Sequence, residues 1–214
     1  MKKQGLALLL GFLMAAGFTA CEKSSNASEG GGASQSGQIA PAEPAGQAFA
    51  LIDEIMNSYS AGAFKAGVVP DEFVDAILRS GQKAPSAGNG QPWYFTVIKN
   101  AAAFAPQLAP RHYRAGAVVI VISGRTDTRF GSPAFDCALA AQNMYLAAQS
   151  LGLGVRMYYS GVREVNDNWK SSLGIPDNHD AQIILLVGYV DDNADAVTSA
   201  SPRRALAENL NYIE

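Results

Sequence analysis

Three parts of the chain space their apolar residues as an amphipathic helix does. Over residues 49–59 apolar side chains recur every three to four positions, and Ser60-Ala61-Gly62 interrupts the pattern. A second helix is expected to begin at Pro70 and reach Gly81, because proline suits a first helical turn and acidic residues favour the positive end of the helix dipole. A third, polar helix is expected over residues 162–173.

Residues 133–150 predict a longer helix that is apolar around almost its whole circumference, with Asp136 as its main charge. A helix of this kind is buried in a core or at an interface between chains. Cys137 lies within it and is interpreted as a small buried apolar residue rather than a redox group.

Continuous apolar runs predict buried strands between these helices. The runs cover residues 117–122 and 183–190, while aromatic and β-branched residues predict strands over 93–98 and 155–159. A short helix is also expected over residues 101–108. The order of elements predicts one α+β domain, in which helices cover both faces of a mixed central sheet.

The N-terminus has the pattern of an export signal. Lys2 and Lys3 precede an apolar run that ends at Ala20, shorter than the ~20 residues of a comfortable membrane span. Phe18-Thr19-Ala20-Cys21 resembles a bacterial lipobox. We therefore expect residues 1–20 to be a lipoprotein signal peptide and Cys21 to carry lipid, at the cell membrane or outer membrane and outside the cytoplasm. The alternatives are an unlipidated signal peptide or an uncleaved membrane anchor.

Residues 21–48 are rich in Ser, Gly, Ala and Gln and poor in large apolar side chains, so they predict a flexible tether to a domain over residues 49–214. Removing residues 1–20 removes two lysines and takes the net charge from -3 to -5. This acidic balance argues against a nucleic-acid partner. His112 and His179 lack neighbouring ligands at metal-binding spacing, so no metal site is expected.

The densest candidate for a binding site is the loop over residues 83–93. Its two prolines restrict the backbone, its two glycines allow close approach of a ligand, and its side chains offer neutral hydrogen-bonding groups. The residues concerned are Pro85, Ser86, Gly88, Asn89, Gly90, Gln91 and Pro92. Such a loop suits a flat heterocycle with polar edge atoms, although an ordinary helix-to-strand loop is the alternative.

This loop resembles the Pro-Ser-x-x-Asn-x-Gln-Pro-Trp signature of the nitroreductase family of FMN-dependent α+β flavoproteins. The resemblance extends from about residue 49 to the C-terminus. It includes the helix over 135–148, the Leu151-Gly152-Leu153-Gly154 turn, Leu173-Gly174-Ile175-Pro176 and Arg203-Arg204-Ala205-Leu206. The resemblance implies an intertwined homodimer with the long helix at its interface and FMN bound between the two subunits.

The same resemblance implies a set of FMN-binding residues. The loop contributes Pro85, Ser86, Asn89 and Gln91 toward the ring and ribityl chain, and Ser60 stands at the serine of the family's phosphate-binding run. Further expected contacts are Ser160 and Gly161 near the pyrimidine and Arg203 and Arg204 at the phosphate. The alternatives are a plain strand end for the first pair and an exposed cationic pair for the second.

One departure affects the phosphate. The family usually carries Arg-Arg-Ser-x-Arg after its first helix, whereas residues 58–62 here read Ser-Tyr-Ser-Ala-Gly without any arginine. Lys65 is the nearest substitute. Each lost charge-assisted hydrogen bond removes about 1.5–3 kcal/mol of binding.

The function implied is an FMN-dependent oxidoreductase that reduces nitroaromatic or quinone-type acceptors near a membrane, with an unidentified reductant and no catalytic side chain. The alternatives are a non-catalytic flavin- or ligand-binding lipoprotein and a nitroreductase-like scaffold that has lost FMN.

Overall fold

The computed structural model describes residues 50–103, 112–129, 131–193, 197–198 and 203–213. All of them belong to one unit, Glu43–Glu214. The signal peptide, the tether and the lipidation site predicted at Cys21 lie outside the described residues. So does most of the short helix expected over 101–108, of which a 3₁₀ turn, η2 (Ala101–Ala103), is described.

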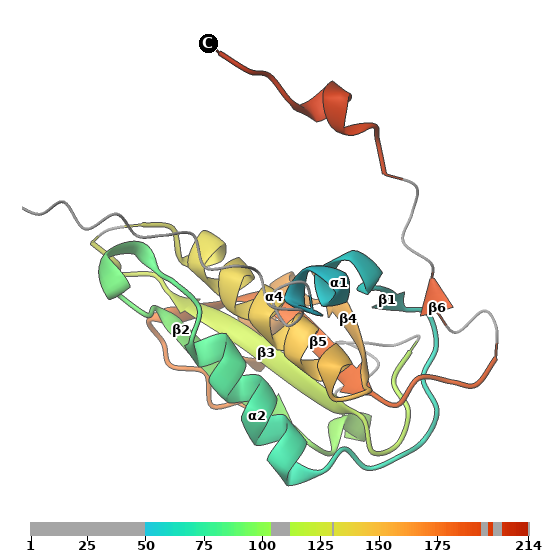
Figure 1. The fold of residues 1–214 in the computed structure, drawn as a ribbon. Coiled ribbons are helices and arrows are strands. Elements are labelled where there is room, and N and C mark those ends of the chain that lie inside the picture. Colours follow the sequence, from blue (N-terminus) through green and yellow to red (C-terminus); the bar gives the residue numbers. More distant parts are fainter. Residues whose placement is uncertain (1–49, 104–111, 130, 194–196, 199–202, 214) are drawn as a thin grey trace, which may run out of the picture. The chain divides into compact units, whose positions relative to one another are not determined.

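A four-stranded sheet forms the centre of the domain (Figure 1). Its spatial order is β2-β3-β5-β4, and all three pairings are antiparallel. The sequence predicted a mixed sheet, but the described strands form an antiparallel one. β5 lies between β3 and β4 and runs opposite to both of them. The strands are β2 (Trp93–Ile98), β3 (Val118–Arg125), β4 (Gly154–Tyr158) and β5 (His179–Gly188).

Two helices cover one face of this sheet: α2 (Asp71–Gln82) and α4 (Pro133–Ser150). Ile77 of α2 and Met144 of α4 are fully buried. The helices pack closely because Gly81 has no side chain; a Cβ there would clash with the Met144 methyl carbon. The expected bounds of α4 are confirmed residue for residue, as are those of β2.

Short segments cover the opposite face. The polar helix expected over 162–173 is instead one turn, α5 (Val162–Glu164), followed by a π-helix, η3 (Val165–Trp169). Val162 and Val165 pack there against the inward residues of β3 and β5. Both faces of β3 are therefore covered, and its first seven residues are all buried, as its continuous apolar run predicted.

The remaining elements are small and partly exposed. The first helix, α1 (Ala50–Asn57), has no buried residue and exposes Leu51 and Met56. The two-residue strand β1 (Ser60–Ala61) pairs with β6 (Val197–Thr198), a pairing that the sequence did not indicate. Residues 203–213, including η5 (Leu206–Asn209), are exposed throughout. Within the described residues, no helix is long and apolar enough to span a membrane.

Candidate functional site

The signature loop is anchored at both ends, as its two prolines suggested. Ala84 is buried and its N–H donates to the Gly81 carbonyl at 3.1 Å, which continues α2 into the loop. Pro92 is also buried, and its carbonyl accepts from Arg125 N–H at 2.9 Å. The loop thus runs between two fixed points, one on α2 and one on the end of β3.

Inside these anchors the loop closes on itself through a short 3₁₀ turn, η1 (Ala87–Asn89). Gln91 N–H donates to Ser86 Oγ at 3.0 Å, and Asn89 N–H donates to the Ser86 carbonyl at 3.0 Å. The hydroxyl oxygen of Ser86 therefore holds the loop together. A ligand that bound Ser86 would accept a hydrogen bond from its hydroxyl group.

Two loop residues have backbone angles that non-glycine residues rarely adopt. Asn89 has φ 55° and Gln91 has φ 45°. Such a left-handed conformation costs on the order of 1–3 kcal/mol per non-glycine residue and concentrates at functional sites. Both side chains are exposed and lie together, since Gln91 Nε2 donates to Asn89 Oδ1 at 3.3 Å. The strained backbone thus presents two amide groups side by side.

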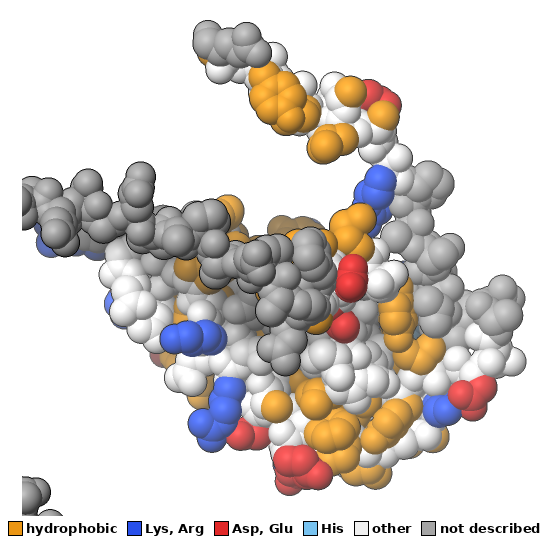
Figure 2. Space-filling model, in the orientation of Figure 1, with side chains coloured by type: hydrophobic (Ala, Val, Ile, Leu, Met, Phe, Trp, Pro, Cys, Tyr) orange, Lys and Arg blue, Asp and Glu red, His pale blue; other side chains and the backbone are white. Residues whose placement is uncertain are grey.

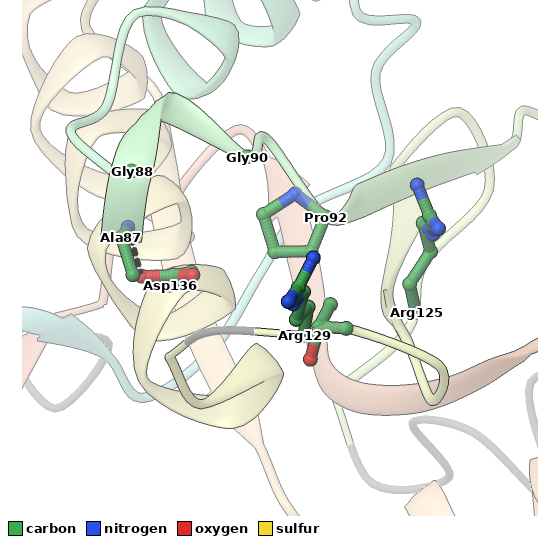
Figure 3. A pocket seen from close by; sticks show the side chains of 8 residues that line it. Ala87, Gly88, Gly90, Pro92, Arg125, Arg129 and Asp136 are labelled. Atoms are coloured by element: carbon green, nitrogen blue, oxygen red, sulfur yellow. Dashed lines mark hydrogen bonds between the residues drawn. The ribbon is translucent and has the colours of Figure 1, made fainter.

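A cavity of about 190 Å³ opens on one side of the loop (Figure 3). Its lining includes Arg125, Arg129 and Asp136, together with the loop itself. Asp136 is buried at 3% exposure, and its Oδ1 accepts from Ala87 N–H at 3.3 Å, which ties the first turn of α4 to the loop. The Arg125 Nε donates to Asp127 at 2.9 Å. The sequence did not indicate these residues, because they join the loop only through strand pairing and helix packing.

A second cavity, of about 320 Å³, opens where the loop leaves α2. Its lining residues are predominantly polar: Arg79, Gln82, Lys83, Ala84, Asn89 and Gln91. Figure 2 shows basic side chains at the surface beside this end of α2. Both amides predicted to bind a ligand therefore share one hollow with Arg79 and Lys83, which were not predicted to bind one. Arg79 and Lys83 are one helical turn apart at the start of the signature loop, and that spacing in the sequence could have identified them.

Ser60 lies at the other end of α4 from the loop. Its neighbour Tyr59 is held by Gln149, whose Nε2 donates to the Tyr59 carbonyl at 2.7 Å and whose Oε1 accepts from Tyr59 N–H at 3.2 Å. The loop meets α4 at Asp136. At 1.5 Å per residue, Asp136 and Gln149 are roughly 20 Å apart along the helix. One copy of the chain therefore does not bring Ser60 and the loop together.

Ser160 and Gly161 follow β4, which is the outer strand opposite β2 in the sheet. Gly161, at φ 130°, caps α5, and its carbonyl accepts from Val165 N–H at 2.9 Å. Ser160 is exposed. The structure therefore separates this pair from the loop by two intervening strands, and its predicted flavin contact stays a prediction.

The predicted phosphate-binding residues are also dispersed. Arg203 and Arg204 are exposed in the stretch 203–213. Lys65, the nearest substitute for the missing arginines, pairs with Asp192 at 2.7 Å on the surface. An exposed pair of this kind contributes little to stability, but it engages the ammonium that a phosphate would need.

Other titratable groups have structural surroundings. Cys137 is fully buried, and burial raises the pKa of its thiol to about 12, as expected for a small apolar residue. Burial also raises the pKa of Tyr158 to about 12, and its hydroxyl lies 2.6 Å from His112 Nδ1. Burial lowers the pKa of His179. Among the described residues no group of three or more potential metal ligands occurs.

The antiparallel sheet, the two helices on one face and the strained polar loop define an α+β domain whose polar loop lies between its second helix and first long strand. The model of the nitroreductase family matches residues 55–114 and 104–189, which together cover most of the domain. The chain belongs to the nitroreductase family.

Two curated archaeal relatives, both described as NADH dehydrogenase/NAD(P)H nitroreductases, match the chain. The relative from Archaeoglobus fulgidus is 31% identical over 140 residues, 59% of this chain and 78% of its own length. The relative from Methanothermobacter thermautotrophicus is 29% identical over 154 residues, 67% of this chain and 78% of its own.

Solved structures share the fold. A nitroreductase from Desulfovibrio desulfuricans in complex with FMN is 26% identical, with a TM-score of 0.63, over 77% of this chain and 97% of its own. A nitroreductase from Bacteroides fragilis with bound FMN is 24% identical, with a TM-score of 0.61, over 77% of this chain and 99% of its own. The expected α+β nitroreductase-like fold is thereby confirmed.

Proposed function

We propose that the protein is an FMN-dependent oxidoreductase that reduces nitroaromatic or quinone-type acceptors. The observation that carries this proposal is the pair of amides at Asn89 and Gln91, held in left-handed backbone beside a cavity. Structures of related nitroreductases contain FMN, which agrees with this assignment.

The loop fits a flavin in three respects. Its amides donate and accept, as the polar edge of an isoalloxazine requires. A Cβ placed on Gly88 would meet no atom within 4 Å, so a ligand can approach the backbone there. The anchors at Ala84 and Pro92 also hold the loop before binding, which lowers the entropy lost when a ligand is ordered.

When bound, FMN supplies hydride acceptance at N5 and transfer of electrons to an acceptor in the same cleft. The protein's part is to position the ring and the acceptor. Asn89 and Gln91 address the polar ring atoms, and Ser86 donates its hydroxyl hydrogen toward the ribityl chain. Because the flavin supplies the redox chemistry, none of these side chains has to act as a general acid or base.

A complete site needs two copies of the chain. Because the loop and Ser60 lie at opposite ends of α4, the loop of one copy would face the Ser60 end of another in a homodimer. The exposed apolar residues of α1 and α4, such as Leu51, Met56 and Phe135, are available for that contact. This arrangement agrees with the composite FMN site that the family resemblance implies.

The location we propose is outside the cytoplasm, at the cell membrane or outer membrane, through lipid on Cys21 and the tether after it. NAD(P)H is not freely supplied there. The reductant we propose is therefore an electron carrier of the membrane or the periplasm. Globomycin, which blocks lipoprotein signal cleavage, should cause an uncleaved precursor to accumulate; cleavage that is insensitive to it would contradict lipidation.

A second candidate is a flavin-binding lipoprotein without turnover, or a scaffold that no longer binds FMN. The observation that favours it is the lack of arginine over residues 58–62, together with the engagement of Lys65 by Asp192. Both leave the phosphate without its usual partners.

Two measurements separate these functions. The purified protein in detergent is incubated with FMN and dialysed, and its visible spectrum is recorded. A flavin band near one per chain supports flavin binding, whereas a colourless folded protein contradicts it. After reduction with dithionite, addition of a quinone or nitroaromatic should reoxidise the bound flavin, and the cycle should be repeatable. A flavin that stays reduced identifies the non-catalytic binder.

A further inference from the structure

Two hollows meet at the loop-side end of α2. The polar cavity described above, of about 320 Å³, is lined by Arg79 and Lys83 together with the loop amides. A neighbouring hollow of about 460 Å³ shares Arg79 and Lys83 and extends to Leu51 and Leu146. We call the two together the α2 cleft. It places apolar side chains, amides and cations along one continuous surface.

The charge of the α2 cleft is positive. No carboxylate is among the residues that line either hollow. Arg79 donates through Nε to Asp75 at 2.7 Å, which uses one of the five N–H donors of its guanidinium. In the described part of the chain Lys83 has no ion pair. Arg79 thus keeps N–H donors for an anion although Asp75 offsets its charge, and Lys83 supplies the charge that is not offset in the described part of the chain.

The plainest alternative is that these cations serve the C-terminus of α2, where positive charge is favoured by the helix dipole. Three carbonyls of that last turn, those of Arg79, Ser80 and Gly81, already have partners. Lys83 N–H donates to the Arg79 carbonyl at 3.1 Å, Ala84 N–H to the Gly81 carbonyl at 3.1 Å, and Asn143 Nδ2 to the Ser80 carbonyl at 3.0 Å. The side chains of Arg79 and Lys83 are therefore not needed as caps.

We propose that Arg79 and Lys83 bind the phosphate group of the flavin, in place of the arginines missing from residues 58–62. This inference rests on the proposed function. A guanidinium and an ammonium in one cleft match a phosphate monoester, since arginine binds two of its oxygens at once and lysine adds a point charge. Asn89 and Gln91 lie in the same cleft, so one ligand reaches amides and cations together.

The test compares FMN with riboflavin, which differ only in the phosphate. Dissociation constants are measured by flavin fluorescence and equilibrium dialysis for the full chain in detergent, and for R79Q, K83Q and the double variant. We expect the wild type to prefer FMN. The double variant should lose about tenfold or more of its FMN affinity, while its riboflavin affinity stays the same.

Arg163→Gln is the matched control, because Arg163 pairs with Asp167 four residues away, as Arg79 pairs with Asp75. It lies outside the α2 cleft and should leave both affinities unchanged. Equal thermal midpoints for all variants exclude misfolding. If the double variant keeps the full preference for FMN, the phosphate lies elsewhere and the inference is wrong while flavin binding stands. If the wild type binds neither flavin, the proposed function fails and the inference fails with it.

Discussion

Asn166 forms two hydrogen bonds with the backbone of a single residue, Ala181. Its Nδ2 donates to the Ala181 carbonyl at 3.2 Å, and its Oδ1 accepts from Ala181 N–H at 2.7 Å. Ala181 lies in β5 where the register with β3 shifts, between Ile122 and Ser123. A side chain of the π-helix thus bonds the backbone of β5 beyond Ile184, where the pairing of β5 with β4 ends.

Asn166→Ala should lower the free energy of unfolding by about 1–3 kcal/mol, because two buried backbone groups lose their partner. Urea denaturation measures the change. Asn168→Ala is the control, since Asn168 Nδ2 donates to Glu164 on the exposed side, and the substitution should change stability by less than about 0.5 kcal/mol. Equal effects of the two substitutions would contradict a specific role for Asn166.

Gln91→Gly should stabilise the protein and weaken flavin binding. Glycine adopts φ 45° without steric cost, and the net gain after its greater unfolded-state entropy is on the order of 0.5–1 kcal/mol. Urea denaturation and flavin fluorescence measure the two effects. The same substitution at Gln142, in the regular helix α4, should instead destabilise by about 1 kcal/mol. A destabilised Gln91→Gly variant would show that the loop is not strained.

Cys137 should resist thiol reagents in the folded protein. With a pKa of about 12 its thiolate fraction at pH 8 is about one in ten thousand, and the side chain has no exposure. Reaction with a chromogenic disulfide reagent, in a Cys21→Ser variant, should be complete in guanidinium and negligible without it. Rapid labelling of the native protein would mean that α4 opens easily from the sheet.

His179 should make stability depend on pH below its ordinary pKa of 6.5. Burial lowers its folded pKa below the ordinary 6.5, so the unfolded chain takes up a proton first as pH falls. The stability that His179 contributes while neutral is present above the unfolded pKa of 6.5. It is lost as the pH falls through the folded pKa. Unfolding free energies across this range should fall less steeply in His179→Gln. An unchanged slope would contradict the shifted pKa.

Much of the fold followed from local pattern. The strand of Trp93–Ile98 and the helix of Pro133–Ser150 were both predicted residue for residue. In each case a proline marks one boundary and a continuous periodic run fills the element. The second helix was also predicted closely, with Pro70 as its N-cap rather than its first residue.

The parts not predicted depend on contacts between distant segments. The sequence of residues 162–173 reads as an ordinary polar helix, whereas the structure has a π-helix whose Asn166 bonds to Ala181, a contact with a distant strand that the local pattern does not contain. The antiparallel pairing of β4 with β5 and the short β1–β6 pair have no local signal. The loop residues are adjacent in the sequence and were identified from it, whereas Arg125 lies beside the loop only because β3 pairs with the strand that follows it.

The length of α4 has a consequence for mixed populations of chains. If each binding site takes its loop from one chain and its Ser60 end from another, two chains with different defects complement one another. A chain with an altered loop and a chain with an altered Ser60 end, mixed in equal amounts, would form half of their dimers as hybrids, and each hybrid would carry one intact site and one doubly altered site. About a quarter of all sites would then bind flavin, although neither defective chain binds it alone.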